Sequence, residues 1–244
     1  MSGQLLRIEG LTRRFGGNVA ISEVSFEVRS GEIVGLIGPN GAGKTTLFNC
    51  MTGYLAPSAG DILFDSRRIN GLRPDQVCRL GMARTWQRVK PLDRLSVLEN
   101  AMIGAFLTTK SPKEAGKAAL EQLHAVGLEA YTDRSAGILP IGLKKKLELA
   151  RVMATRPRMV LLDEICGGLN SSETGAILDI VRSLRKQGVT ILFIEHDMYA
   201  VTSICDRIVV LNSGEKLTEG TPEEITSHPG VIAAYLGGGY HARD

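Results

Sequence analysis

Gly38-Pro39-Asn40-Gly41-Ala42-Gly43-Lys44-Thr45 follows the pattern of a phosphate-binding loop: a glycine, four residues, a second glycine, a lysine and a hydroxyl residue. The run 33–37 before it is apolar, as in a buried parallel strand, and residues 46–51 predict a helix. A strand that turns sharply into a helix points backbone N–H groups and the positive helix end at one place. A glycine-rich turn that binds nothing is the alternative, and the lysine and hydroxyl argue against it.

The residues of this loop have separate expected tasks. Glycines let the backbone approach a ligand closely and adopt conformations that a Cβ atom would forbid. Lys44 is expected to reach the outer phosphates, and the Thr45 hydroxyl is expected to bind Mg²⁺. The predicted phosphate-binding residues are Gly38, Pro39, Asn40, Gly41, Ala42, Gly43, Lys44, Thr45 and Thr46.

Composition limits the class of protein. A chain of 244 residues with 43% hydrophobic and 23% charged residues is ordinary for a globular protein. The formal net charge of +3 is too small to argue for a nucleic-acid partner. The four cysteines show no metal-ligand spacing, which favours a reduced, cytoplasmic compartment. The sequence shows no signal peptide and no apolar run of about eighteen residues, so we expect any membrane association to come through a partner.

Secondary-structure patterns predict an α/β core with a helical insertion. Short strands are expected on both sides of the phosphate loop, and the strand at 20–28 alternates as an antiparallel strand does. Between Val89 and Arg156 the patterns are helical, and strand patterns return at Met159. We predict a single domain with a core at 1–88 and 157–228, a helical subdomain at 89–156 and a C-terminal tail at 229–244.

Two acids follow the apolar strand expected at 159–162. Ligands of parallel sheets bind beyond the carboxyl ends of the strands, which is where Asp163 and Glu164 stand. Asp163 is placed to hold Mg²⁺, directly or through water. Glu164 is placed to accept a proton from a water that attacks the γ-phosphate. Paired acids after a strand are also common in helix caps, and the phosphate loop in the same chain favours the catalytic interpretation.

Two further strands end on polar side chains. His196 follows the strand at 190–194, at the same predicted sheet edge as Asp163. Gln87 ends the strand predicted at 82–87 and is a candidate to position water or Mg²⁺. A lone histidine is usually structural and a lone glutamine is usually a surface amide, so their positions at strand ends make them candidates.

In this order the motifs resemble those of the ATP-binding cassette (ABC) transporter ATPases across essentially the whole chain. The resemblance implies a RecA-like P-loop NTPase core with an antiparallel β subdomain and a helical insertion, with ATP and Mg²⁺ as ligands. It implies that Phe15 stacks on adenine, that Gln87 couples the site to a membrane partner, and that His196 holds the γ-phosphate. Such cassettes work as head-to-tail dimers, in which each ATP lies between one phosphate loop and the signature segment of the other subunit.

The signature segment departs from the family pattern. Leu139-Pro140-Ile141-Gly142-Leu143 stands where the family has Leu-Ser-Gly-Gly-Gln. Pro140 offers neither a hydroxyl nor a backbone N–H, so we predict that it weakens the closed dimer. Ile141 and Gly142 remain expected nucleotide contacts, because the start of the following helix still favours an anion. Lys144-Lys145-Lys146 is expected to form a solvated helix face.

Within the family, three segments look most like those of importers of branched-chain amino acids or related amides. They are 163–170, 85–87 and 234–237. This resemblance implies an ATPase on the inner face of the cell membrane, with integral-membrane permease subunits, a second ATPase subunit and, indirectly, a solute-binding protein as partners. An exporter or lipid-extraction cassette is the main alternative, because other subunits select the cargo.

Three other classes fit less well. DNA-maintenance ATPases of this superfamily place long coiled coils between the positions that correspond to Gln87 and Gly142. In this sequence only 142 − 87 = 55 positions separate the two residues, which leaves no room for such coiled coils. Translation-associated cassette proteins normally carry two cassettes in one chain. An unrelated phosphate-loop kinase would not explain His196 together with the signature-like segment.

Overall fold

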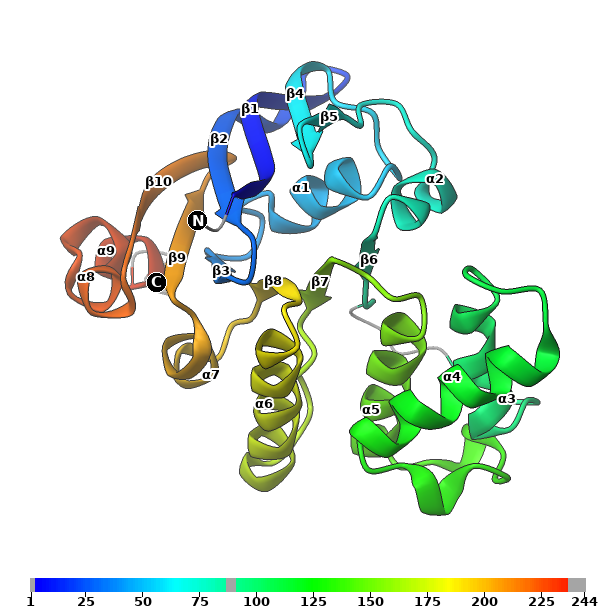
Figure 1. Cartoon of the computed structure of the whole chain (residues 1–244). Helices are drawn as coiled ribbons and strands as arrows, with labels where there is room; N and C mark the ends of the chain where they lie inside the picture. The colour runs from blue at the N-terminus through cyan, green and yellow to red at the C-terminus, as the bar shows by residue number, and fades with distance from the viewer. Residues whose placement is uncertain (1–2, 87–90, 237–244) are drawn as a thin grey trace. The chain divides into compact units, whose positions relative to one another are not determined.

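A computed structural model describes residues 3–86 and 91–236 of the chain (Figure 1). These residues divide into two compact units. The first unit holds the chain up to Val77 and again from Thr190 onward, and the second unit holds Cys78–Val189. Across the described ranges, no helix is both long enough and apolar enough to cross a membrane.

The first unit contains an antiparallel sheet with the strand order β2-β1-β4-β5, drawn in blue and cyan in Figure 1. The strands are β1 (Gln4–Phe15), β2 (Asn18–Arg29), β4 (Ala59–Phe64) and β5 (Arg67–Arg68). β2 pairs antiparallel with β1 and buries alternate residues over most of its length, as its sequence predicts. β1 pairs with β2 as far as Phe15, and the chain reverses at Gly16-Gly17.

The phosphate loop leaves the second sheet of this unit, whose strands follow the order β10-β9-β3-β8. They are β3 (Ile33–Ile37), β8 (Thr190–Ile194), β9 (Arg207–Asn212) and β10 (Glu215–Gly220). β3 runs parallel to both β8 and β9, and every residue of β3 and β8 is buried. The carboxyl ends of these three strands therefore lie at one edge of the sheet, as the apolar runs predict.

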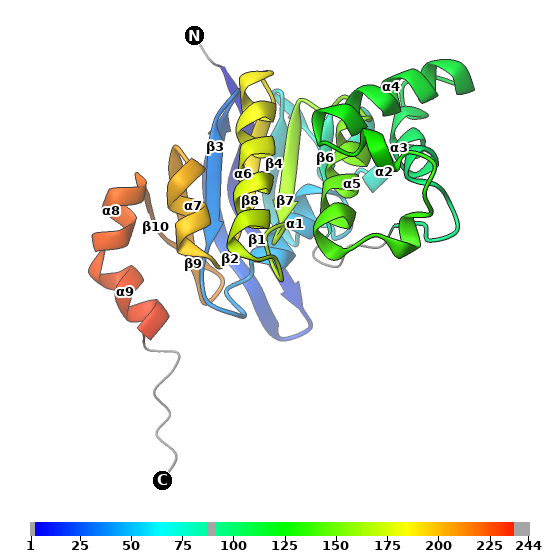
Figure 2. The ribbon, with the colours of Figure 1, turned by 90° about the horizontal axis from the view of Figure 1, so that it is seen from below.

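The helices of the first unit are α1 (Lys44–Met51), α7 (Met198–Ile204), α8 (Pro222–Ser227) and α9 (Pro229–Leu236). α8 begins with a capping box between Thr221 and Glu224. α9 follows α8 directly, and the two helices pack together in Figures 1 and 2. We predicted no helix at α9, because its residues are too uniformly apolar to show a helical period.

The second unit combines two parallel strands with a group of helices. α2 (Pro74–Arg79) leads the chain into it. Its other elements are β6 (Met82–Arg84), α3 (Val97–Ala105), α4 (Pro112–Ala125), η1 (Glu129–Tyr131), η2 (Ala136–Ile138), α5 (Ile141–Met153), β7 (Met159–Asp163) and α6 (Ser171–Lys186). α3, α4 and α5, in green in Figures 1 and 2, pack around the buried alanines Ala105, Ala115 and Ala154. These three helices confirm the helical patterns predicted between 89 and 156.

β6 is shorter than the strand predicted at 82–87. It pairs with β7 from Met82 to Arg84 and then ends. The next amides leave the regular ladder, because the Trp86 N–H donates to the side chain of Glu148 at 2.8 Å. Gln87, the predicted end of this strand, lies outside the described residues.

Candidate functional site

The phosphate loop joins β3 to α1. Its last glycine, Gly43, is the N-cap residue of α1 and has a left-handed backbone with φ of 98°. Glycine has no side chain that could accept hydrogen bonds from the first N–H groups of the helix. The first turn, Lys44-Thr45-Thr46, also contains no acid. The N–H groups and the positive end of α1 are therefore left to a ligand. This is the arrangement predicted for a polyphosphate site.

Two glycines of the loop have no room for a side chain. A Cβ atom on Gly38 would lie 2.2 Å from the carbonyl oxygen of Leu211, and one on Gly43 would lie 2.7 Å from that of Ala20. Both glycines also have positive φ angles that other residues rarely adopt. Backbone packing against β9 and β2 therefore fixes both ends of the loop.

Lys44 is folded back into the loop. Its Nζ donates to the carbonyl oxygen of Gly38 at 2.6 Å and to that of Pro39 at 3.0 Å, and the residue is only 7% exposed. Thr45 lies beside it in the first turn of α1 and is exposed. The loop thus holds one buried cation next to open helix amides, which suits an anionic ligand.

His196 lies at the same sheet edge as the phosphate loop. The register pairs Leu36 of β3 with Ile194 of β8, so the residues that follow the two parallel strands emerge side by side. Glu195 is buried, whereas His196 is exposed. The structure therefore places the histidine at the sheet edge from which the phosphate loop leaves β3, and its contact with a γ-phosphate remains a prediction.

Tyr235 also contacts the phosphate loop, and we did not predict it. Its hydroxyl oxygen accepts a hydrogen bond from the N–H of Gly38 at 2.9 Å. Burial raises the pKa of this phenol, and the Gly38 N–H opposes that shift. The hydroxyl therefore stays protonated at neutral pH and can accept the amide.

Phe15 is the last residue of β1 and is 44% exposed. The guanidinium carbon of Arg13 lies 4.6 Å from the centre of its ring. An exposed aromatic ring at the start of a hairpin turn is available for stacking, and the arginine adds a cation beside it. The adenine contact of Phe15 remains a prediction.

In the second unit, Asp163 ends β7 and forms a buried ion pair. The Arg84 Nη2 atom lies 2.8 Å from its Oδ2 atom, and the two side chains are 6% and 4% exposed. The backbone N–H of Asp163 donates to the Thr85 hydroxyl at 3.0 Å. The carboxylate is therefore held at the carboxyl end of its strand by contacts that come from β6 and the residue after it.

Arg84 is itself placed by its neighbours. Its guanidinium carbon lies 4.4 Å from the centre of the Trp86 ring. The Trp86 amide is bonded to Glu148 on α5, a residue that is 2% exposed. Burial raises the pKa of Glu148, against the opposing effects of the Trp86 amide and nearby cations. A chain of contacts thus runs from Asp163 through Arg84 and Trp86 to Glu148.

Glu164 follows Asp163 with a backbone φ of 50°, which is uncommon for a residue with a side chain. Its carbonyl oxygen accepts a hydrogen bond from Lys145 Nζ at 3.1 Å. Lys145 is 3% exposed, so the prediction of a solvated lysine face is wrong at this position. The reason is that Lys145 reaches inward to the acidic strand end, whereas Lys144 and Lys146 stay partly exposed.

The signature segment starts α5. Pro140 is the N-cap residue, and the first turn, Ile141-Gly142-Leu143, contains no acid. Ile141 is 47% exposed, while Gly142 is buried and a Cβ atom on it would lie 2.7 Å from Glu173 Oε1. A proline side chain cannot accept hydrogen bonds from the first N–H groups of the helix. The start of α5 therefore resembles that of α1, because no side chain caps either helix.

Comparison with known proteins agrees with these features. Residues 21–167 match the family model described as ABC transporter, and residues 215–241 match the one described as Branched-chain amino acid ATP-binding cassette transporter. The chain belongs to the ABC transporter family. This cassette is 43% identical to the high-affinity branched-chain amino acid transport ATP-binding proteins BraF of Pseudomonas aeruginosa and LivG of Escherichia coli, covering 97% of this chain and 99% of each relative. It is 31% identical to the crystal structure of the ADP conformation of an ATP-binding cassette of an ABC transporter, with a TM-score of 0.89 and coverage of 97% and 100%.

The oxygen donors of this cassette suit Mg²⁺. Magnesium prefers oxygen ligands and usually keeps several waters and phosphate oxygens, so one or two protein ligands are enough. Thr45 offers a hydroxyl in the first turn of α1, and Asp163 offers a carboxylate at a strand end. Among the residues that the structure covers, no cluster of three or more histidines, cysteines or acids forms a protein-only metal site. The donor set therefore fits a metal that arrives with a nucleotide.

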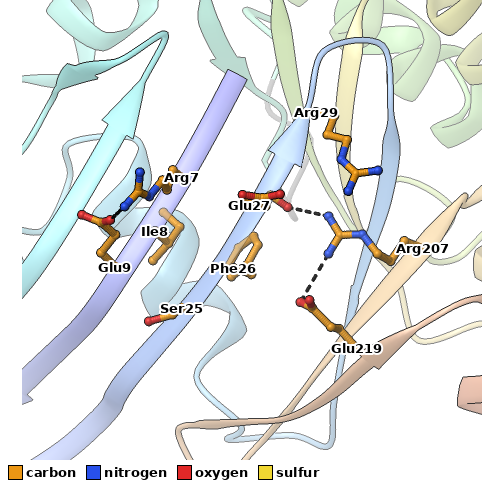
Figure 3. A pocket seen from close by; sticks show the side chains of 9 residues that line it. All are labelled: Arg7, Ile8, Glu9, Ser25, Phe26, Glu27, Arg29, Arg207 and Glu219. Carbon is orange, nitrogen blue, oxygen red and sulfur yellow. Dashed lines mark hydrogen bonds and ion pairs between the residues drawn. The ribbon is translucent and has the colours of Figure 1, made fainter. Parts of the chain in front are cut away.

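A hollow of about 530 Å³ lies elsewhere on the first unit (Figure 3). Its lining comes from β1, β2, β9 and β10, and none of the predicted site residues is among the lining side chains. Arg207 pairs there with Glu219 at 3.3 Å and donates to the Glu27 carbonyl oxygen, and Arg7 pairs with Glu9. These paired charges give no reason to place the nucleotide in this hollow.

Four residues of the ABC cassette's site escaped the sequence analysis: Arg84, Lys145, Glu148 and Tyr235. Lys145 and Glu148 lie on α5 at the helical spacing of the apolar residues Leu149 and Val152, so that two charges interrupt an apolar face. That break was a usable signal. Arg84 and Tyr235 gave none, because their partners are distant in sequence.

Proposed function

We propose that this cassette binds and hydrolyses ATP and that hydrolysis powers the transport of a solute across a membrane. The observation that carries the proposal is the start of α1, where Lys44 lies buried against two loop carbonyls and no side chain caps the helix. Membership of the ABC transporter family identifies ATP as the ligand that suits this loop.

The first unit supplies the groups that bind the nucleotide. Lys44 moves from its loop carbonyls to the β- and γ-phosphates, and the loop amides neutralise the remaining charge. His196 holds the γ-phosphate, which its position beside the loop supports. Phe15 stacks on the adenine, with Arg13 next to its ring.

Four residues carry the metal and the hydrolytic step in this proposal: Thr45, Asp163, Glu164 and Gln87. Thr45 and Asp163 hold Mg²⁺, which supplies positive charge to the phosphates when it is bound. Glu164 accepts the proton of the attacking water, and Gln87 positions the water or the metal. Phosphoryl transfer to water depends on positioning and charge neutralisation more than on covalent chemistry, so these tasks suffice.

Two cassettes close around ATP in this proposal. Ile141 and Gly142 of a second cassette, identical or similar, contact the γ-phosphate through the open start of α5. Hydrolysis removes this contact and lets the dimer open, which is a population shift set by the different affinities for ATP and ADP.

We further propose import of branched-chain amino acids or related small polar solutes. The names of the relatives at 43% identity and the match of residues 215–241 support this cargo and weigh against the exporter alternative. The cassette then lies on the inner face of the cell membrane, attached to integral-membrane permease subunits and served indirectly by a solute-binding protein.

A pair of variants tests the ATPase proposal. Glu164→Gln should bind ATP, lose at least about 100-fold in turnover because its general base is gone, and accumulate as a dimer. Lys44→Ala should lose ATP binding itself. Near-normal turnover of Glu164→Gln would remove Glu164 from the mechanism, and retained ATP binding in Lys44→Ala would remove the phosphate loop.

Uptake tests the cargo. Cells that carry Lys44→Ala in place of the natural chain should lose most high-affinity uptake of radiolabelled leucine, isoleucine and valine. Uptake of an unrelated solute, such as a sugar, is the control. Unchanged uptake of all three amino acids would exclude them as the cargo.

A further inference from the structure

The C-terminal helix reaches the phosphate loop through one side chain. The hydroxyl of Tyr235 on α9 accepts the N–H of Gly38 at 2.9 Å, although the two residues are 197 positions apart. Both belong to the first unit, and Gly38 is buried. A buried backbone N–H that loses its acceptor carries the full cost of its desolvation. The start of the phosphate loop therefore depends on a residue near the far end of the chain.

The Gly38 peptide is held on both sides. The Tyr235 hydroxyl accepts a hydrogen bond from the Gly38 N–H. The Gly38 carbonyl oxygen accepts a hydrogen bond from Lys44 Nζ at 2.6 Å. Gly38 also packs so tightly against the Leu211 carbonyl that no Cβ atom fits. Tyr235 and Lys44 thus hold the two successive peptide groups that meet at Gly38, one through its N–H and the other through its carbonyl oxygen.

Ligand binding changes one end of this chain. Lys44 is expected to leave the loop carbonyls when phosphate oxygens replace them as its partners. The Gly38 carbonyl then loses the bond that faces the ligand, while the bond from its N–H to Tyr235 does not depend on the lysine. Tyr235 is therefore suited to keep the first peptide of the loop in place as the lysine moves.

We propose that Tyr235 is a positioning residue for the phosphate loop and that α9, through this hydroxyl, sets the affinity of the cassette for ATP. The inference rests on the proposed binding of ATP by this loop. Because coupling between two sites is reciprocal, bound ATP also stabilises the docked position of α9. Residues 215–241, which include α9, match the model for branched-chain amino acid cassettes, so this control belongs to the segment that marks that branch.

Tyr235→Phe tests the proposal, because it removes the hydroxyl and keeps the ring. We expect ATP affinity, measured with a fluorescent ATP analogue, to fall about fivefold to tenfold, the scale of one lost hydrogen bond to a buried amide. Turnover at saturating ATP should stay within about twofold, so the effect appears in KM and not in kcat. Tyr131→Phe, which keeps the ring beside Arg134 in the second unit, is the matched control and should change neither value.

Hydrogen exchange gives a readout that a purely structural tyrosine would not affect. In Tyr235→Phe the Gly38 amide should exchange at least about tenfold faster, since its acceptor is gone. ATP should slow exchange of the amides in α9 in the natural chain and should slow it much less in the variant.

The outcomes separate this inference from the ATPase proposal. If Lys44→Ala abolishes ATP binding while Tyr235→Phe leaves both ATP affinity and Gly38 exchange unchanged, the inference is wrong and the ATPase proposal stands. If ATP affinity falls without any change in Gly38 exchange, Tyr235 acts by another route and the inference is also wrong. If Lys44→Ala still binds ATP, the phosphate-loop proposal itself is overturned.

Discussion

The phosphate loop and the acidic end of β7 are built on different principles. The loop is a backbone structure, in which Gly38 and Gly43 pack against carbonyl oxygens and α1 opens with uncapped amides. The acidic end is a side-chain structure, in which Asp163 is fixed by a buried arginine and the Glu164 carbonyl by a buried lysine. One site displays helix amides that no side chain caps, and the other holds its acids beside buried cations.

The ligand that we propose for each site accounts for this difference. A polyphosphate needs many donors at one point, and backbone N–H groups supply them without adding buried charges. A metal-binding carboxylate must stay buried and oriented before its ligand arrives, so it needs a cationic partner. The loop should therefore be sensitive to added volume, whereas the acidic end should be sensitive to lost charge.

Gly38→Ala should have the largest effect, because it adds volume where the loop has none. Its Cβ atom would lie 2.2 Å from the Leu211 carbonyl, at a φ of 152°. We expect ATP affinity to fall at least about 100-fold, since the loop peptide must move away from its position for phosphate binding. Binding of a fluorescent ATP analogue measures the loss, and circular dichroism checks that the fold persists.

Gly142→Ala is the matched control at the other helix start. Its Cβ atom would approach Glu173 Oε1, the end of a side chain that can shift at the cost of its capping hydrogen bond from the Asn170 N–H. ATP binding to the single cassette should change less than about threefold, because a flexible carboxylate yields where a backbone carbonyl cannot. A similar loss in both variants would contradict the comparison.

Arg84→Gln should have the next largest effect, on stability. It leaves the Asp163 carboxylate, 4% exposed, without its arginine. Breaking a buried ion pair in this way costs about 3 kcal/mol of unfolding free energy, and chemical denaturation measures it. The Arg84→Met, Asp163→Leu double variant should recover much of that loss, because it removes both charges.

An exposed ion pair of the same unit provides the control. Arg182 and Asp179 are separated by the same 2.8 Å, but their side chains are 44% and 76% exposed. Arg182→Gln should cost less than about 1 kcal/mol, because water screens the pair. Equal losses from Arg84→Gln and Arg182→Gln would show that burial does not set the strength of the Asp163 contact.

The two sites also differ in how far the sequence predicts them. The phosphate loop is a local pattern, so its residues, the strand before it and the helix after it all follow from one short segment. Asp163 and Glu164 could be predicted as acids at a strand end, because strand and acids are adjacent. Their partners could not, since Arg84 reaches Asp163 across 79 positions.

The missed elements have physical reasons as well. β6 was predicted too long because Thr85 and Trp86 continue a strand-like pattern in the sequence. In the structure the Trp86 N–H donates its hydrogen bond to the Glu148 side chain and not to a neighbouring strand. α9 was missed because an apolar run shows no period, and Tyr235 was missed with it. In the case of β6 a distant contact decided the local structure.

Pro140→Ser should have a smaller effect and should sharpen the comparison of the two helix starts. A serine N-cap can accept the first amides of α5, which proline cannot, and such caps are worth about 1 kcal/mol. Its hydroxyl and N–H also restore donors for a γ-phosphate. We expect the ATP-dependent dimer of the Glu164→Gln cassette to live several-fold longer, as measured by gel filtration and subunit exchange. An unchanged lifetime would exclude Pro140 as the weak point of the dimer.

Glu148→Gln should have the smallest effect on stability, and the size of that effect depends on pH. Burial raises the folded-state pKa of Glu148 above its unfolded value, so the folded chain holds this proton more tightly than the unfolded chain. As pH rises from about 4, the unfolded chain releases the proton first, and the natural protein loses stability relative to the glutamine variant until the folded carboxyl has also ionised. The glutamine carbonyl can still accept a hydrogen bond from the Trp86 N–H, so the fold should persist.

Denaturation at several pH values measures the difference in stability between the natural protein and the variant, with Glu121→Gln at an exposed position as the control. A variant whose relative stability falls as pH rises would show that Glu148 is held as a favourable charge, and the acidic end would then consist entirely of paired charges.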